Sequence, residues 1–583
     1  MDLSDQQKDI INAPISPLSV VACAGSGKTR TAVNRLVKVR SDLHKHRGYV
    51  ALLSFSNVAI KTFKDDYSNY MRQSSNLNNG YNDRVVIETL DSFLTSNILR
   101  PHASRSMNTQ KTPFLITGSE QFLNNKQYKF WAEPSNGNPF QVQPKDIGNI
   151  TVRVTDKGSS FWLNSFSTLQ PLNNGYTVME RLGKLGAYTH ELGKFWACKT
   201  LLDQKGILKA FVQRYPHIIV DEAQDIDALH SYLLEILIEA GVTVTLIGDP
   251  NQAIYEFAGA NGRFLKDFDL QDLNSSLPLS VNYRSVEDIL KISNKLSKKN
   301  DKHDRKTAHN DFGAYYCVYD KAKTSELTDS FACKVESLGL NHSDSAILFR
   351  GRASIKKLSN TPSEIGQGKT KLLALATIER DINKDYYAAF KLLVESVLGL
   401  LQNVPDDLRG QLVGNKIDPV FRNLRRRLWL FLRSSDNGLP SSTLSAKNEW
   451  HKLLKKRVIS LLNSIEADYG YQPVDRIGNK IAATKLPITS LVPHVEKKLI
   501  RDNKIRIDTV HQSKGESLSA VLYVATVGDH IRKMLDGTET ELGRIGYVAL
   551  TRAKDIFVLA VPKNHINEFQ PELLQLGLKE WII

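Results

Sequence analysis

The segment Ala24-Gly25-Ser26-Gly27-Lys28-Thr29 has residue types that suit phosphate chemistry. The apolar run Leu18–Cys23 before it predicts a buried strand, and the residues after it predict a helix. Glycines let backbone N–H groups turn toward an anion, and a helix N-terminus adds its dipole. Lys28 can reach the β- and γ-phosphates of a nucleotide, and the Thr29 hydroxyl can bind Mg²⁺.

A glycine-rich turn with a chance lysine is the alternative. The order of strand, glycines, Gly-Lys-Thr and helix favours a phosphate-binding loop, which implies ATP and Mg²⁺ as ligands. The residues expected to hold the nucleotide are Ala22, Cys23, Ala24, Gly25, Ser26, Gly27, Lys28, Thr29 and Arg30.

The stretch HIIVDEAQDID places Asp221 and Glu222 directly after a second apolar run. Ligands of α/β sheets bind at the carboxyl ends of the strands, where these two side chains would lie. We expect Asp221 to hold Mg²⁺ and Glu222 to take a proton from the attacking water. An acidic helix start is the structural alternative, but the phosphate-binding loop in the same chain disfavours it.

The stretch LIGDPNQAIYEFAGA repeats the pattern of a strand followed by a polar turn. The amide of Gln252 suits a sensor of the γ-phosphate. Tyr255 and Phe257 are aromatic residues that can stack on nucleic-acid bases, although such residues more often belong to a core.

The composition is that of a globular protein with a basic surface. The chain has 583 residues, of which 41% are hydrophobic and 24% charged, and its formal net charge is +15. A positive excess favours a polyanionic partner such as nucleic acid. No apolar run is long enough to span a bilayer and no signal-peptide core begins the sequence, so we expect a cytoplasmic protein without a membrane partner. The four cysteines show no metal-ligand spacing.

Apolar runs that precede short polar motifs recur along the chain, with helical patterns between them, as in parallel α/β layers. Two stretches interrupt this rhythm. The first, roughly from 97 to 215, is rich in Asn, Gln, Ser and aromatic residues, and its stretch NITVRVTDKGSSFWLN predicts a hairpin that turns at Asp156-Lys157-Gly158. The second, from 354 to 498, is helical and basic.

Ten short motifs in this order resemble those of superfamily 1A DNA helicases of the UvrD/Rep/PcrA type. They are LSDQQ (Q motif), the phosphate-binding loop (I), LLSFSNVAIKTF (Ia), TLDSF (Ib), VDEAQD (II), GDPNQAIYEFAGA (III), NYRS (IV), AILFRGR (IVa), IDTVHQSKGES (V) and YVALTRAK (VI). The resemblance spans the chain from Leu3 to about Pro562.

The resemblance implies roles for several residues. Gln7 would read adenine and Tyr283 would stack on it. Arg284 would touch the γ-phosphate, and Arg552 would be an arginine finger that stabilises transition-state charge. Contacts to single-stranded DNA are implied for Phe55, Ser56, Asn57, Thr509 and His511.

The motifs also depart from the family pattern. Cys23 replaces a common glycine of motif I, which raises the question of redox sensitivity. Asp91 stands in motif Ib where many relatives have His, and Ala258 stands in motif III where Arg is frequent. In motif V the common Gly-Leu-Glu is Gly515-Glu516-Ser517, so the family's ribose-binding glutamate has no clear counterpart.

The resemblance implies an α/β fold with two RecA-like parallel-sheet motor domains, each with an inserted and mostly helical subdomain. The expected first motor domain (1A) comprises 1–96 and 216–280, and the second (2A) comprises 281–353 and 499–583. The first insertion (1B) is expected at 97–215 and the second insertion (2B) at 354–498.

The predicted function is an ATP-dependent DNA helicase or translocase that moves 3′ to 5′ on single-stranded DNA and acts on forked DNA. The alternative is an ATPase that senses DNA ends and regulates a partner without unwinding. In the second insertion, the basic runs Arg425–Arg427 and Lys455–Arg457 suggest contacts to duplex phosphates.

No nuclease pattern of the form Asp…Glu-x-Lys is present between motifs Ib and II, and only a short tail follows motif VI. We therefore expect any cleavage to come from a separate nuclease subunit, of the OLD-like type. The variant motif V and the stretch YTHELGKFWA resemble compact phage-defence relatives such as the GajB subunit of Gabija systems. DNA repair and phage defence both stay open as pathways.

Overall fold

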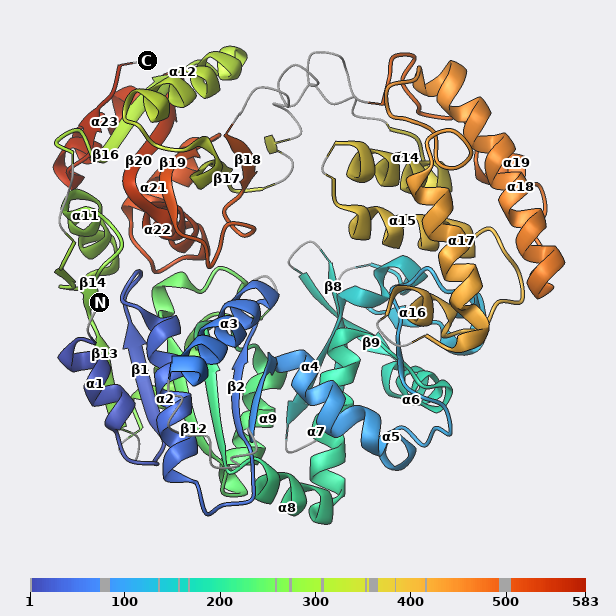
Figure 1. Cartoon of the computed structure of the whole chain (residues 1–583), viewed down its shortest axis with the longest axis horizontal. Coiled ribbons are helices and arrows are strands. Elements are labelled where there is room, and N and C mark those ends of the chain that lie inside the picture. Colours follow the sequence, from blue (N-terminus) through green and yellow to red (C-terminus); the bar gives the residue numbers. More distant parts are fainter. Residues whose placement is uncertain are drawn as a thin grey trace.

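Two parallel six-stranded sheets form the framework of the computed structural model, and helices cover both (Figure 1). The structure describes residues 3–73, 84–134, 137–155, 158–165, 168–256, 259–271, 275–305, 309–351, 354–355, 365–382, 384–414, 417–491 and 505–582. In Figure 1 the two sheets lie on the left and the two insertions on the right, so that the four parts form a ring. The predicted fold class, an α/β chain with two parallel-sheet units, is confirmed.

The first sheet has the strand order β13-β1-β12-β11-β2-β3. Its strands are β1 (Leu18–Ala22), β2 (Val50–Ser54), β3 (Val85–Thr89), β11 (His217–Asp221), β12 (Thr243–Gly248) and β13 (Ser275–Leu279). The helices that accompany it are α1 (Asp5–Asn12), α2 (Lys28–Asp42), α3 (Asn57–Gln73), α4 (Leu90–Leu94), α9 (Ala228–Glu239) and α10 (Arg263–Asp269).

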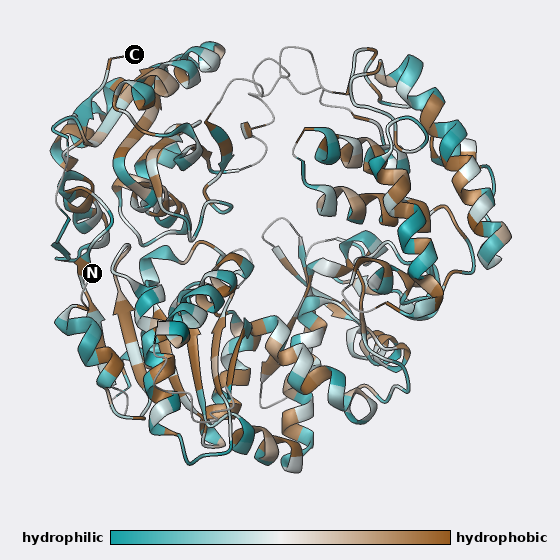
Figure 2. Ribbon diagram, in the orientation of Figure 1, coloured by the Kyte–Doolittle hydropathy of each residue, from teal (hydrophilic) through white to brown (hydrophobic). Residues whose placement is uncertain are grey.

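The apolar runs seen in the sequence form the buried centre of this sheet. Strands β2 and β11 are buried along their whole length, as expected for parallel strands covered on both faces. They are coloured as hydrophobic in Figure 2, whereas the surrounding helices alternate in colour. All strands of this sheet are parallel, so the loops after β1, β2 and β11 emerge at one edge.

The second sheet has the order β18-β17-β19-β20-β16-β21 and is also parallel throughout. Its strands are β16 (Gly313–Tyr319), β17 (Ser345–Phe349), β18 (Arg506–Thr509), β19 (Leu518–Val524), β20 (Ala553–Pro562) and β21 (Lys579–Glu580). The helices that accompany it are α11 (Glu287–Ser297), α12 (Thr324–Ser337), α21 (Gly528–Leu535), α22 (Glu541–Arg552) and α23 (Ile566–Leu576).

The first insertion combines helices with a five-stranded antiparallel sheet of order β6-β5-β9-β8-β7. Its strands are β5 (Trp131–Ala132), β6 (Phe140–Gln141), β7 (Ile150–Thr155), β8 (Gly158–Ser165) and β9 (Thr168–Asn173), and its helices are α5 (Arg100–Ser106), α6 (Gly175–Leu185), α7 (His190–Asp203) and α8 (Lys205–Arg214). The predicted hairpin is confirmed, because β7 and β8 pair antiparallel from Ile150 opposite Leu163 to Thr155 opposite Gly158; Asp156 and Lys157 of the predicted turn lie outside the described residues. The other strands add a sheet where mostly helices were expected.

The second insertion is helical in its described part, as predicted. Its helices are α14 (Gly368–Asp381), α15 (Tyr386–Leu398), α16 (Leu408–Val413), α17 (Arg422–Arg433), α18 (His451–Tyr469) and α19 (Ile477–Lys480). They surround a core of their own, in which Trp450 is fully buried and donates its indole N–H to the Pro440 carbonyl at 3.2 Å. Neither these helices nor any others in the described ranges are long and apolar enough to cross a membrane.

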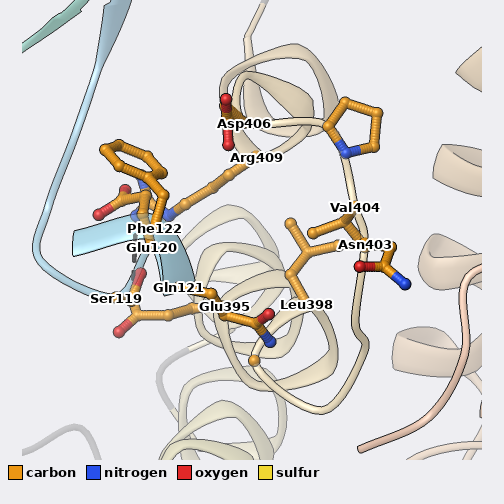
Figure 3. Close-up of a pocket in the computed structure, with 12 residues that line it drawn as sticks. Ser119, Glu120, Gln121, Phe122, Glu395, Leu398, Asn403, Val404, Asp406 and Arg409 are labelled. Carbon is orange, nitrogen blue, oxygen red and sulfur yellow. Dashed lines mark ion pairs between the residues drawn. The ribbon is translucent and has the colours of Figure 1, made fainter. Parts of the chain in front are cut away.

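The two insertions meet at a cavity of about 210 Å³ (Figure 3). Gln121 of the first insertion donates its amide N–H to the Leu401 carbonyl of the second. Lys111 lies 3.9 Å from Asp406, and both side chains are substantially exposed, so this ion pair contributes little stability.

Replacing Trp450 with Ala is expected to destabilise the second insertion selectively, by about 3–5 kcal/mol. The substitution leaves a cavity in a core that the first sheet does not share. Hydrogen exchange on the full chain should show lower protection in α14–α18 and unchanged protection in β1 and β11. Leu430→Ala, at a residue that is 60% exposed on α17, is the matched control and should change neither. Equal loss of protection in the first sheet would contradict an independent core.

Candidate active site and nucleic-acid groove

The phosphate-binding loop joins β1 to α2 with two glycines in the left-handed region. Gly25 has φ +74° and Gly27 has φ +82°, values that L-residues adopt at a cost in strain. A Cβ at Gly25 would lie 2.5 Å from Cβ of Arg284, and one at Gly27 would lie 2.7 Å from Nε2 of Gln7. Both glycines are therefore needed for the turn and for close approach of neighbouring elements.

Lys28 lies inside the curve of the loop. Its ammonium group donates to the Cys23 carbonyl at 3.3 Å, and the Ser26 hydroxyl donates to the same oxygen at 2.8 Å. Cys23 itself is 2% exposed, and burial raises the pKa of its thiol to about 12. The thiolate is the reactive form of cysteine, so this environment disfavours redox chemistry at Cys23 at neutral pH.

The acidic pair lies at the end of β11. Glu222 has φ +55°, a conformation that is strained for this residue and typical of functional sites. Burial and the adjacent Glu222 charge raise the pKa of Asp221 to about 8. Burial also raises the pKa of Glu222, but Lys28, Lys514 and Arg552 outweigh it and hold the pKa below its usual value. Glu222 is thus ionised at neutral pH, as a general base requires.

Asp221 and Thr29 can hold Mg²⁺. Both line one cavity of about 530 Å³, and Asp221 is only 3% exposed. Its Oδ1 atom is buried without a hydrogen-bond partner. An unpartnered carboxylate oxygen beside a hydroxyl fits the oxygen ligands that Mg²⁺ prefers, and a bound cation would favour the ionised form of Asp221.

Two arginines reach this site from the second sheet. Arg552, at the end of α22, is 2% exposed and donates to Gln252 Oε1 at 2.7 Å. Arg284 donates to the Thr551 carbonyl at 3.1 Å. Burial, followed by the charge of Arg552, lowers the pKa of Arg284 to about 9. Burial likewise lowers the pKa of Arg552. The cleft therefore holds one buried cation, Arg552, and one partly buried cation, Arg284, which favours a polyanionic ligand.

Asp249 orients the predicted sensor, Gln252. The Gln252 amide donates its N–H to Asp249 Oδ2 at 2.9 Å, which turns its oxygen toward Arg552. Lys299, from the chain that follows α11, lies 3.3 Å from Asp249 Oδ1. Burial raises the pKa of Asp249, but Lys299 and Lys28 outweigh it and hold the pKa below its usual value. Sequence reasoning missed the pairing of Asp249 with Lys299, because the two residues lie fifty positions apart along the chain.

A second cavity, of about 430 Å³, lies beside the phosphate-binding loop. It brings together six residues predicted for nucleotide binding with three to which no nucleotide contact was assigned. The predicted ones are Gln7, Gly25, Gly27, Arg30, Tyr283 and Arg284, and the others are Arg305, Ser517 and Lys554. The Gln7 amide donates to the Ser26 carbonyl at 3.2 Å and accepts from the Ser4 backbone N–H at 3.1 Å, so its orientation is fixed. Ser517, the last residue of the variant Gly515-Glu516-Ser517, lines this cavity.

The larger cavity continues from the acidic pair into a groove. It contains the predicted DNA-binding residues Phe55, Ser56, Tyr255 and His511. Asn57 begins α3, and Thr509 ends β18 and bonds Gln512; neither lines the cavity. Phe257 and Ala258 lie outside the described residues.

The groove is also lined by a partly buried ionic cluster that the sequence did not predict. His230 of α9 lies 3.1 Å from Asp91, the variant residue of motif Ib, and 3.0 Å from Asp227. Burial lowers the pKa of His230, but Asp227 and Asp91 outweigh it and raise the pKa above its usual value. Lys194 of α7 pairs with Asp227 at 2.6 Å. The Phe55 ring meets the His230 ring edge-on at 5.5 Å.

A buried ion pair joins the groove to the second sheet. Lys514 of motif V lies 2.5 Å from Asp225 of motif II, and both side chains are under 10% exposed. The same ammonium group lies 4.8 Å from the centre of the Tyr255 ring. Motifs II, III and V therefore meet at one point between the nucleotide and the groove.

The basic runs of the second insertion divide into internal and exposed residues. Arg427 pairs with Asp468, and Arg457 donates to the Ser435 and Gly438 carbonyls at 2.8 and 3.0 Å. Arg425 donates to the Gly414 carbonyl at 3.1 Å, whereas Arg426 is exposed. The residues that line a shallow cavity of about 380 Å³ on this face are Ile417, Arg422, Arg425, Arg426, Trp429 and Arg433.

Comparison with known proteins agrees with this arrangement. The family model of the UvrD/REP helicase N-terminal domain matches residues 3–166 and 177–272. The model of the UvrD-like helicase C-terminal domain matches residues 400–564. Together they cover the first sheet except β13, strands β18, β19 and β20 of the second sheet, and parts of both insertions.

Several curated relatives align along nearly the whole chain. The putative ATP-dependent DNA helicase YjcD of Bacillus subtilis is 24% identical over 96% of this chain and 79% of its own length. The ATP-dependent DNA helicase Rep of Buchnera aphidicola is 22% identical over 96% of this chain and 93% of its own length. DNA helicase II of Escherichia coli is 22% identical over 94% of this chain and 83% of its own length. The chain therefore belongs to the UvrD/Rep helicase family.

Proposed function

We propose that this chain is an ATP-dependent DNA helicase that couples ATP hydrolysis between its two sheets to movement along single-stranded DNA. The observation that carries the proposal is the contact between Arg552 of the second sheet and Gln252 of the first, at 2.7 Å. Hydrolysis at such a site depends on how the two sheets are placed, so each cycle can move one against the other.

The residues divide the chemistry between them. Lys28 and the loop N–H groups bind the phosphates, and Thr29 and Asp221 hold Mg²⁺, which neutralises charge on the β- and γ-phosphates. Glu222 accepts the proton of the attacking water. Arg284 and Arg552 stabilise the charge that develops on the γ-phosphate. Gln7 and Tyr283 bind adenine on the other side of the loop.

The groove is the proposed path of single-stranded DNA. Phe55 and Tyr255 offer rings for base stacking, and Ser56, Asn57, Thr509 and His511 offer polar groups near the backbone. Phe257, outside the described residues, is proposed as a further stacking residue. Arg426, exposed on α17, suits contact with duplex phosphates ahead of the groove.

The direction of movement, 3′ to 5′, and the forked DNA substrate are proposed from the family resemblance, as is a role in phage defence or repair. A cytoplasmic location and a separate nuclease partner are proposed from the sequence patterns described above. A strand-displacement assay with 3′-tailed and 5′-tailed duplexes tests the activity and its direction. Release of a strand only from the 3′-tailed duplex is expected. Hydrolysis stimulated by DNA with no release from either duplex would favour the sensor alternative.

Lys28→Ala is expected to abolish ATP turnover, because the cation that pairs with the β- and γ-phosphates is lost. Steady-state phosphate release with single-stranded DNA measures the effect. Lys38→Ala, at the exposed end of α2 where Lys38 pairs with Asp42, is the control and should leave turnover unchanged. Turnover near the wild-type rate in Lys28→Ala would contradict the proposed loop function.

Glu222→Gln is expected to bind ATP normally and to hydrolyse it at least about 100-fold more slowly, because the general base is lost while Asp221 remains. Equilibrium ATP binding and single-turnover hydrolysis separate the two effects. Glu239→Gln, at the far end of α9, serves as the control. If Glu222→Gln hydrolysed ATP at the wild-type rate, another group would be the base.

Arg552→Ala is expected to lower kcat by about 10³–10⁵ with a much smaller change in ATP affinity, since an arginine finger acts on transition-state charge. Arg532→Ala, which removes an exposed arginine paired with Glu568 and Glu572, controls for loss of positive charge. A variant with unchanged kcat and weaker ATP binding would refute the finger assignment.

A further inference from the structure

The antiparallel sheet of the first insertion has two unlike faces. On β7 and β8 the residues alternate, and Ile150, Val152, Phe161 and Leu163 are all under 5% exposed. They pack in one core with residues of α6 and α7. Successive side chains of a strand point to opposite sides, so the intervening residues form an outer face.

Aromatic and polar residues dominate this outer face. The strand register places Trp162 opposite Thr151 and Pro171, Arg153 opposite Ser160, and Trp131 opposite Asn173. The described outward positions are Trp131, Glu133, Gln141, Thr151, Arg153, Ser160, Trp162, Asn164, Leu169, Pro171 and Asn173. Arg153 places a positive charge beside Trp162, whereas the Glu133 carboxylate, on the β5 side of the face, accepts from the Asn173 amide at 2.6 Å.

Trp131 is exposed on this face and Trp162 is partly exposed. Trp131 is 43% exposed, which is unusual for so large an apolar side chain. Trp162 donates its indole N–H to the Ser160 hydroxyl at 3.0 Å, and the Arg153 guanidinium lies 5.2 Å from the ring centre. Two strands and two residues separate the tryptophans, a distance of about 12 Å from sheet geometry, which allows each ring to contact a different base.

The sheet adjoins the groove. The backbone N–H of Val152, on the edge strand β7, donates to Glu191 Oε1 at 3.3 Å. Glu191 pairs with Lys194 at 2.6 Å, and Lys194 lines the groove together with Phe55. Strand β8 rises on the side of the first insertion nearest the middle of the ring (Figure 1).

We propose that the outer face of this sheet is a second binding site for single-stranded DNA, continuous with the groove, in which bases stack on Trp162 and Trp131 and Arg153 contacts a phosphate. The proposal rests on the proposed function and extends it to a surface outside the helicase motifs. Stacking accepts every base and a guanidinium reads only the backbone, so the site binds without regard to sequence.

The test is a double variant, Trp131→Ala with Trp162→Ala, compared with wild type by fluorescence anisotropy on oligo-dT strands of increasing length. Short strands that fill only the groove should bind equally well. On long strands the double variant should bind at least about 25-fold more weakly, from at least fivefold per lost ring. The single variant Trp162→Phe keeps a stacking ring, so it should bind long strands with most of the wild-type affinity.

Tyr176→Ala is the matched control, because Tyr176 lies on α6 of the same insertion, is also 43% exposed and packs beside Phe161 on the inner side. It should bind long strands like wild type. A strand carrying 5-iodouracil should crosslink to the peptide that contains Trp162. Equal binding of long strands by the double variant, or absence of the crosslink in wild type, would overturn the proposal.

A blunt duplex serves as a further probe, and an equal loss of its affinity in the double variant would overturn the assignment to single strands. The proposed function is judged separately, by stimulation of wild-type ATPase with the short strands. Absence of that stimulation would count against the helicase activity whatever the sheet binds. The crosslink and Trp162→Phe keep the test valid if the double variant folds poorly.

Discussion

The arrangement of the active site depends on positive charge that is buried between the two sheets. Arg284 and Arg552 are desolvated, and their hydrogen-bond partners in the described residues are carbonyl and amide oxygens rather than carboxylates. Burying such charges is costly, and the nearby Glu222 carboxylate offsets only part of the cost, because burial still lowers the pKa of both arginines. A bound triphosphate would pair with these guanidinium groups and relieve the cost of burying them. Part of its binding free energy therefore comes from the relief of this unfavourable burial. The cleft is therefore complementary to the charge of the reacting phosphates.

Backbone contacts fix this cleft from both sides. The Tyr283 N–H donates to the Gly25 carbonyl at 3.0 Å, and the Asn282 amide donates to the Ala24 carbonyl at 2.7 Å. The motif IV segment is thereby attached to the phosphate-binding loop, and a nucleotide that reshapes this loop acts directly on the second sheet. By contrast, the described polar contacts between the two insertions are one hydrogen bond and a long, exposed ion pair. Such contacts couple the positions of the two insertions only weakly.

Local signals in the sequence predicted most of the candidate site. A phosphate-binding loop needs glycines at positive φ, and a strand followed by acidic residues is visible without knowledge of the fold. Long-range partners were not predictable, because Lys299 and Asp249 are fifty residues apart and meet only when the sheets assemble. Likewise, exposed Arg426 and internally paired Arg427 look alike in a basic helix. The two-residue strands β5 and β6 are too short to show a period, so the sheet of the first insertion was predicted only as its hairpin.

One departure from the family pattern, Asp91 in motif Ib, is compensated by a neighbouring residue. Asp91 in motif Ib carries a negative charge where relatives often have His, and the imidazole that neutralises it comes from His230 on α9. This exchange keeps a charged pair under Phe55 and links it through Asp227 to Lys194 and Glu191. Glu191 in turn bonds the edge of the inserted sheet. The floor of the groove is thus connected by ionic contacts to the first insertion, and its connection to the nucleotide passes through Asp225 and Lys514. A strand that moves Phe55 acts on His230 and hence on the ionic contacts that lead to the first insertion. A strand that moves Tyr255 acts on Lys514, whose partner Asp225 belongs to motif II.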